Sequence, residues 1–149
     1  MSDLYDTDVV SWSERQAALL RRVAGGEHVN DLVDWPNVIE EVESVGISEI
    51  NATLSQIDNV LRHRIYLLGW PQSPSVRVWR AELREFQRQL DRHYRPSMTT
   101  GGNPRVTDDV VLEAYAAAVD YCAAHMDTDP TQPLPEACPW SLADILTGG

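Results

Sequence analysis

The chain has 149 residues, 43% of them hydrophobic, and a formal net charge of -11 at pH 7. This length and composition predict one folded domain with a buried core and exclude a disordered chain. The excess of acidic residues disfavours binding to nucleic acid or to an anionic membrane. All 12 basic residues are arginine, which excludes Schiff-base chemistry at a lysine.

The charge is unevenly distributed along the chain. Residues 1–50 carry 11 acids and 3 arginines, residues 51–100 carry 4 acids and 8 arginines, and residues 101–149 carry 8 acids and 1 arginine. The basic middle segment can therefore be neutralised by the acidic segments on either side. The N-terminus lacks an apolar signal core, and no apolar run has the length of a membrane span. We expect a cytoplasmic protein with no membrane segment and with reduced cysteines.

The hydrophobic periodicity is helical along most of the chain, and no segment has the pattern of a β-strand. The first predicted helix covers about residues 6–23 and ends at a Gly-Gly pair. The second begins after Asp34, and its apolar stripe continues to Leu68, so that a single helix would span roughly 50 Å. Because that is long for a small domain, we expect a break or kink near Gly46, with Ser48 as a second N-cap.

The third predicted helix, at about residues 75–94, has the clearest amphipathic pattern. Apolar residues on one of its faces are Val76, Trp79, Leu83, Phe86, Leu90 and Tyr94; arginines on the other are Arg77, Arg80, Arg84, Arg88, Arg92 and Arg95. A fourth helix begins after Thr107, an expected N-cap. A Pro-rich extended strap at about residues 128–140 and a short helix from Ser141 to Leu146 follow. The sequence therefore predicts an all-α bundle of four main helices plus a short C-terminal helix, forming a single domain over residues 1–149, with no sheet.

Short motifs follow one another along the chain in an order that resembles a known family. They include Tyr5-Asp6-x-Asp8 with Trp12, Asn37-Val38-Ile39-Glu40-Glu41-Val42-Glu43 with Gly46, His63, Trp79-Arg80, and Cys138-Pro139-Trp140. In this combination the chain resembles the bacterial "domain of unknown function 29" family. The resemblance implies an all-α fold and a bacterial source. It implies no activity, because the family has no established one.

Three glutamates lie within four residues near the start of the second predicted helix. At about 100° per residue, Glu43 falls on the inner stripe, Glu40 at its border, and Glu41 toward solvent. One interpretation is that Glu40 and Glu43 form a carboxylate pair for metal binding or acid–base chemistry. The interpretation we favour is that Glu43 is a buried structural acceptor, paired with an arginine, a histidine or a helix end.

The histidine spacing argues against a metal site. None of the four histidines has an acidic residue three positions before it, as the ligands of ferritin-like bundles require. A single-metal site from Glu43 and one histidine stays open, although no motif supports it. Cys122 and Cys138 lack the spacing of a zinc or redox motif and are interpreted as buried thiols. We therefore expect no metal and no cofactor.

His63 is predicted beside the apolar face of the second helix, and we interpret it as a structural histidine. If the second and third helices form an antiparallel hairpin, His63 falls beside Trp79, Arg80 and Ala81. In the same register Glu43 approaches Arg95. The competing hypothesis is an enzyme in which a polar cluster surrounds a pocket and one arginine holds an anion. That cluster would contain Glu40, Glu43, His63, Trp79 and Arg80.

The arginine face of the third helix is the second candidate site. Like charges four residues apart on a helix cost a few tenths of a kcal/mol, roughly, so an opposing charge should offset them. The face either binds an anion or a partner, or, as we favour, is solvated and braced by Glu82, Glu85 and Asp91 and by the acidic segments elsewhere in the chain. The aromatic residues of this helix are predicted to point inward, which leaves no stacking platform for single-stranded nucleic acid.

The sequence favours a small, non-catalytic binding or regulatory module whose protein partner contacts the arginine face. The alternatives are an enzyme using the Glu/His/Arg cluster and a structural subunit that assembles with itself. The sequence leaves the oligomeric state and the identity of any ligand open.

Overall fold

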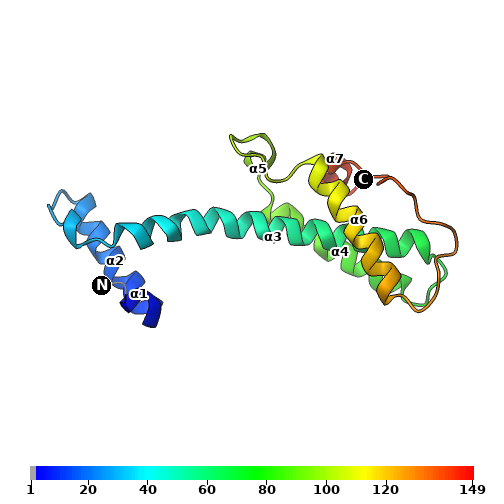
Figure 1. Ribbon diagram of the computed structural model, residues 1–149, viewed down its shortest axis with the longest axis horizontal. Helices are drawn as coiled ribbons and strands as arrows, with labels where there is room; N and C mark the ends of the chain where they lie inside the picture. The colour runs from blue at the N-terminus through cyan, green and yellow to red at the C-terminus, as the bar shows by residue number, and fades with distance from the viewer. Residues whose placement is uncertain (1–2) are drawn as a thin grey trace. The chain divides into compact units, whose positions relative to one another are not determined.

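The computed structural model describes residues 3–149, and these form α-helices and one short 3-10 helix without any β-strand (Figure 1). The elements in chain order are α1 (Asp3–Thr7), α2 (Val9–Ala24), η1 (Asn30–Leu32), α3 (Trp35–Gly69), α4 (Val76–His93), α5 (Ser97–Thr100), α6 (Asp108–His125) and α7 (Leu142–Thr147). The predicted all-α fold, with four long helices and a short C-terminal one, is confirmed. None of the helices within residues 3–149 combines the length and the apolar character of a membrane span.

The chain divides into two compact units between Ile47 and Ser48. The first unit contains α1, α2, η1 and the start of α3, and the second contains the rest of α3 and everything after it. The expectation of a single domain over residues 1–149 stays a prediction.

The expected break in the second helix is wrong. Helix α3 is one helix of 35 residues, and Ser48 lies inside it instead of capping a new one. A lone glycine costs a helix only about 1 kcal/mol relative to alanine, which is too little to end a long helix whose one proline, Pro36, lies in its first turn. Gly46 is exposed, and a Cβ atom there would meet no other atom within 4 Å.

The first unit has a small core with a polar junction beside it. Its buried apolar side chains are Trp12, Leu19 and Val33. The Asp34 carboxylate accepts hydrogen bonds from Asn37 Nδ2 at 2.8 Å and from Trp12 Nε1 at 2.9 Å, which together hold the pKa of Asp34 below its ordinary value. The buried Gln16 accepts a hydrogen bond from the Asp34 backbone N–H at 2.8 Å. This junction fixes the start of α3 against α2.

The second unit has a larger core, built from α3, α4, α6 and α7. Side chains with no more than 1% exposure come from every one of these helices and include Ile57, Leu61, Ile65, Leu90, Val111, Cys122 and Ile145. Helices α3 and α4 are antiparallel, since His93 contacts Glu49 while His63 contacts Glu82. Thr107 caps α6 as predicted, accepting a hydrogen bond from the Val110 N–H.

An extended segment between α6 and α7, here called the strap (residues 126–141), covers part of this core. Trp70 Nε1 donates to the carbonyl oxygen of Thr128 at 2.9 Å, and the Thr131 N–H donates to the carbonyl oxygen of Gly69 at 2.7 Å. A Cβ atom at Gly69 would lie 3.2 Å from both Leu134 and Pro130, so glycine allows the strap to approach closely. The tip of the α3–α4 hairpin is therefore tied to the strap.

Candidate functional site

His63 is a buried polar side chain of the second unit, and both of its ring nitrogens have a partner. It is 7% exposed, and the rings of Tyr66 and Phe86 pack edge-on against it with centroids 5.3 and 4.9 Å away. Its Nδ1 lies 2.8 Å from the carbonyl oxygen of Asn59, and its Nε2 lies 2.7 Å from Glu82 Oε2. Both ring nitrogens of His63 therefore have an oxygen partner within hydrogen-bonding distance, and the tautomer decides which nitrogen donates.

The predicted neighbours of His63 differ in detail from the observed ones. The hairpin register placed Trp79 and Arg80 beside it, whereas Glu82 on the next turn of α4 makes the contact. Trp79 instead stacks on Tyr66 with ring centroids 5.0 Å apart. Arg80 is exposed and has no described hydrogen bond or ion pair. The polar partner of His63 is therefore a carboxylate, and it lies in the same hairpin.

We expect Glu82→Gln and His63→Phe each to destabilise the protein modestly, with a coupling energy of about 1 kcal/mol in a double-mutant cycle, because Glu82 is half exposed. Phenylalanine keeps the contacts with Tyr66 and Phe86 and removes both hydrogen bonds. Urea denaturation of the two single variants and the double variant measures the coupling. Additive effects would contradict the contact as a source of stability.

The prediction that Glu43 is buried is wrong. Glu40 and Glu43 are both exposed, and Glu41, which was predicted to face solvent, is the half-buried one. Tyr5 donates to Glu41 Oε1 at 2.6 Å, and this hydrogen bond raises the pKa of Tyr5 to about 12. The helical wheel assumed that the apolar stripe faces inward, but in the first unit Tyr5 of α1 binds on the opposite side of α3. The five side chains of the proposed catalytic cluster are divided between the two units, with Glu40 and Glu43 in the first.

The arginine face of α4 is fully presented to solvent. All six of its arginines are exposed: Arg77, Arg80, Arg84, Arg88, Arg92 and Arg95. Arg88 forms an ion pair with Glu85 at 2.7 Å, which holds the pKa of that carboxyl below its usual value. Arg95 donates to the carbonyl oxygens of Arg92 and Tyr94 at the end of the helix.

Two of the three acids of α4 that were expected to brace this face make no described ion pair with its arginines. Of the three acids named for it, Glu85 pairs with an arginine, Glu82 pairs with His63, and Asp91 has no described ion pair. Within residues 3–149, four of the six arginines of this face therefore have side chains without a described hydrogen bond or ion pair. These four are Arg77, Arg80, Arg84 and Arg92.

The sequence as a whole matches the family described as "Domain of unknown function DUF29" over residues 4–148. The chain belongs to the DUF29 family. Its fold is similar to that of an α-helical protein of unknown function from Rhodospirillum rubrum, known from a crystal structure, with a TM-score of 0.64 and 22% sequence identity. That similarity covers 95% of this chain and 88% of the other one. No curated protein is significantly similar to this chain.

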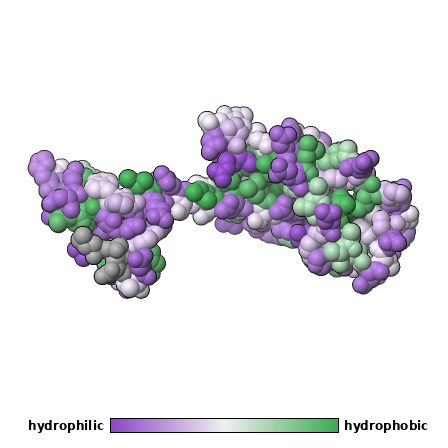
Figure 2. All heavy atoms as spheres, viewed as in Figure 1, coloured by the Kyte–Doolittle hydropathy of each residue, from purple (hydrophilic) through white to green (hydrophobic). Residues whose placement is uncertain are grey.

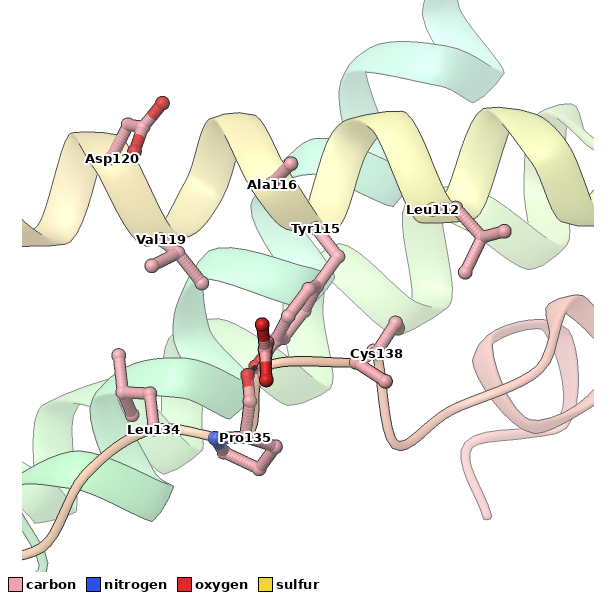
Figure 3. Close-up of a pocket in the computed structure, with 10 residues that line it drawn as sticks. Leu112, Tyr115, Ala116, Val119, Asp120, Leu134, Pro135 and Cys138 are labelled. Atoms are coloured by element: carbon pink, nitrogen blue, oxygen red, sulfur yellow. Dashed lines mark hydrogen bonds between the residues drawn. The ribbon is translucent and has the colours of Figure 1, made fainter.

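The DUF29 chain also has a groove that its sequence did not indicate. It lies between α6 and the strap, has a volume of about 560 Å³, and is lined mostly by apolar side chains such as Leu112, Val119 and Leu134 (Figure 3). Tyr115 closes its floor by donating to the carbonyl oxygen of Pro135 at 2.6 Å. Only the long-range path of the strap creates this groove, and local sequence patterns carry no signal for such a path.

The two cysteines of the DUF29 chain are free thiols. Burial raises the pKa of the Cys122 thiol to about 11 and also raises that of Cys138, whose Sγ donates to the carbonyl oxygen of Trp140. A thiol with a raised pKa is a poor nucleophile at neutral pH. In the described part of the chain, from residue 3 onward, no group of three or more His, Cys, Asp or Glu side chains could hold a metal ion.

Proposed function

We propose that this protein is a non-catalytic binding module of the bacterial cytoplasm, and that the arginine face of α4 contacts an acidic surface of a protein partner. The observation that carries the proposal is the set of four exposed arginines on this face for which neither a hydrogen bond nor an ion pair is described, on a chain with a net charge of -11. Their mutual repulsion is relieved when carboxylates of a partner lie between them.

The chemistry of α4 favours a protein over a nucleic acid. Its aromatic side chains, Trp79 and Phe86, pack against the buried core, so no ring is presented for stacking on a base. The acidic remainder of the chain repels a phosphate backbone.

The test is the binding of a fluorescently labelled poly-glutamate peptide, measured by anisotropy at low salt. The double variant Arg80→Glu/Arg84→Glu should bind about tenfold more weakly or worse, because it reverses two adjacent charges of the face. The matched control is Arg21→Glu/Arg105→Glu, which makes the same change in net charge at two exposed arginines outside α4. The control should bind like the unmodified protein, and both variants should keep its circular dichroism spectrum.

Two results would overturn the proposal. One is equal peptide binding by the α4 variant and the control variant. The other is tighter binding of a single-stranded oligonucleotide than of poly-glutamate, which would assign the arginine face to nucleic acid.

A further inference from the structure

Most of the large apolar side chains that are exposed in this protein lie in the first unit. Two of the large exposed apolar side chains, Val78 and Leu112, belong to the second unit. The eight others lie in the first unit and are Val9, Val10, Leu32, Trp35, Ile39, Val42, Val45 and Ile47, each between 38% and 69% exposed. Figure 2 shows apolar surface along the first part of α3.

A unit of this size needs additional cover. It ends at Ile47 and buries three large apolar side chains, and no disulfide is present because both cysteines are in the second unit. Below about 40–50 residues, a folded unit usually needs a disulfide, a metal ion or a partner subunit in order to be stable. A partner that covers the exposed apolar side chains would supply the missing burial.

The chemistry of the exposed surface on α3 restricts what can cover it. This surface, here called the α3 apolar face, consists of Trp35, Ile39, Val42 and Ile47. Glu43 projects between Ile39 and Ile47, which are four residues before and after it, and Glu40 lies at the edge. Covering the face with an uncharged surface would bury a carboxylate without a partner, at a high free-energy cost. The occupant must therefore bring cations together with apolar surface.

The chain itself carries such a surface. We propose that the α3 apolar face of one copy docks on the arginine face of α4 of a second copy, an inference that rests on the proposed function and names its partner. Arginine side chains can cover apolar groups with their aliphatic stems while the guanidinium groups pair with Glu40 and Glu43. Val78, which is 56% exposed on the same helix, adds apolar area.

Charge distinguishes this contact from a symmetric contact between two first units. Residues 1–50 carry a net charge of -8 and residues 51–100 a net charge of +4, so the proposed contact joins opposite charges. A contact between two first units would bring their carboxylates together. Because the two docking surfaces differ, the contact is heterologous, and the copies form either a closed ring or pair, or an open chain.

Light scattering over a range of protein concentrations tests the inference. The mass should rise above the 16.7 kDa of one chain with concentration and should fall when salt is added. Glu40→Arg/Glu43→Arg and Arg80→Glu/Arg84→Glu should each weaken self-association about tenfold or more. An equal mixture of the two variants should recover it, since each reversed surface then meets a complementary one.

A mass of 16.7 kDa at every concentration would overturn the inference, as would full self-association of the Glu40→Arg/Glu43→Arg variant or a mixture that fails to recover. The poly-glutamate assay separates this failure from failure of the proposed function. The Glu40→Arg/Glu43→Arg variant keeps an intact arginine face and should still bind the peptide. A monomeric protein that binds poly-glutamate would retain the proposed function and would reject the second copy as its partner.

Discussion

Replacing Trp70 with alanine is expected to lower the free energy of unfolding of the second unit by about 3–5 kcal/mol. Trp70 follows the last residue of α3, is 6% exposed and belongs to the core. Its indole N–H also holds the strap through the carbonyl oxygen of Thr128. The substitution therefore leaves a large cavity and frees the start of the strap. Urea denaturation followed by far-ultraviolet circular dichroism measures the loss.

Two further variants separate packing from hydrogen bonding at this position. Trp70→Phe keeps an aromatic ring in the core and removes the N–H donor, so we expect a loss of about 1–2 kcal/mol. Leu112→Ala removes a side chain of α6 that is 52% exposed, and it should cost less than about 1 kcal/mol. If Trp70→Ala were no more costly than Leu112→Ala, Trp70 could not be part of the core.

Replacing Arg64 with methionine is expected to lower the free energy of unfolding by about 2–3 kcal/mol. Arg64 Nη1 donates to the carbonyl oxygen of Gly149 at 2.7 Å, and Nη2 donates to that of Asp144 at 3.2 Å. The guanidinium carbon also lies 5.4 Å from the centroid of the Trp140 ring. Burial lowers the pKa of Arg64, but the group stays charged at neutral pH. Methionine keeps an unbranched apolar stem similar to the aliphatic part of arginine and removes the hydrogen-bond donors.

Hydrogen exchange shows where the effect of the Arg64 substitution is localised. The amides of α7 should exchange faster in Arg64→Met, while those of α2 in the first unit should not change. The α7 exchange rates of Arg64→Lys should fall between those of the unmodified protein and those of Arg64→Met. The reason is that an ammonium group does not reproduce the two-pronged geometry of guanidinium. The matched control is Arg105→Met at an exposed site, which should leave both stability and α7 exchange unchanged. Unchanged exchange of α7 in Arg64→Met would contradict the anchoring role.

The sequence predicted those elements whose signals are local. The alternation of apolar residues and arginines in α4 shows which face is buried, and Leu90 on the predicted inner face is fully buried. Thr107 is a capping residue followed by acids in the first turn, and it caps α6. A helix with strong caps and a single apolar stripe can be recognised without knowing what packs against it.

The sequence could not show which apolar stripe would be covered. Ile39 and Val42 have the same spacing as buried residues further along α3, yet they are 53% and 69% exposed. For that reason Glu43 was predicted to be buried and Glu41 to be exposed. The helical period determines which residues share a face, but the position of α1 determines which face of α3 Tyr5 contacts. That position depends on contacts between residues far apart in the chain.

Trp70 is the converse case: its side chain is buried, although nothing in the local sequence indicates this. It stands in a Gly-Trp-Pro sequence that is typical of a turn, and the backbone does turn there. Its burial depends on the strap, whose contact with it comes from Thr128, 58 residues later. Turn signals predict the backbone conformation and do not show whether a side chain is buried or exposed. The groove between α6 and the strap escaped prediction for the same reason.

The burial of α7 has a consequence for the order in which this protein can fold during synthesis. Ile145 is fully buried in the core of the second unit, and Arg64 reaches a carbonyl oxygen 85 residues further along the chain. The first unit can form its contacts as soon as the start of α3 has left the ribosome. The core that includes α4 stays incomplete until residues 142–149 have emerged, so its apolar stripes remain available to chaperones until then.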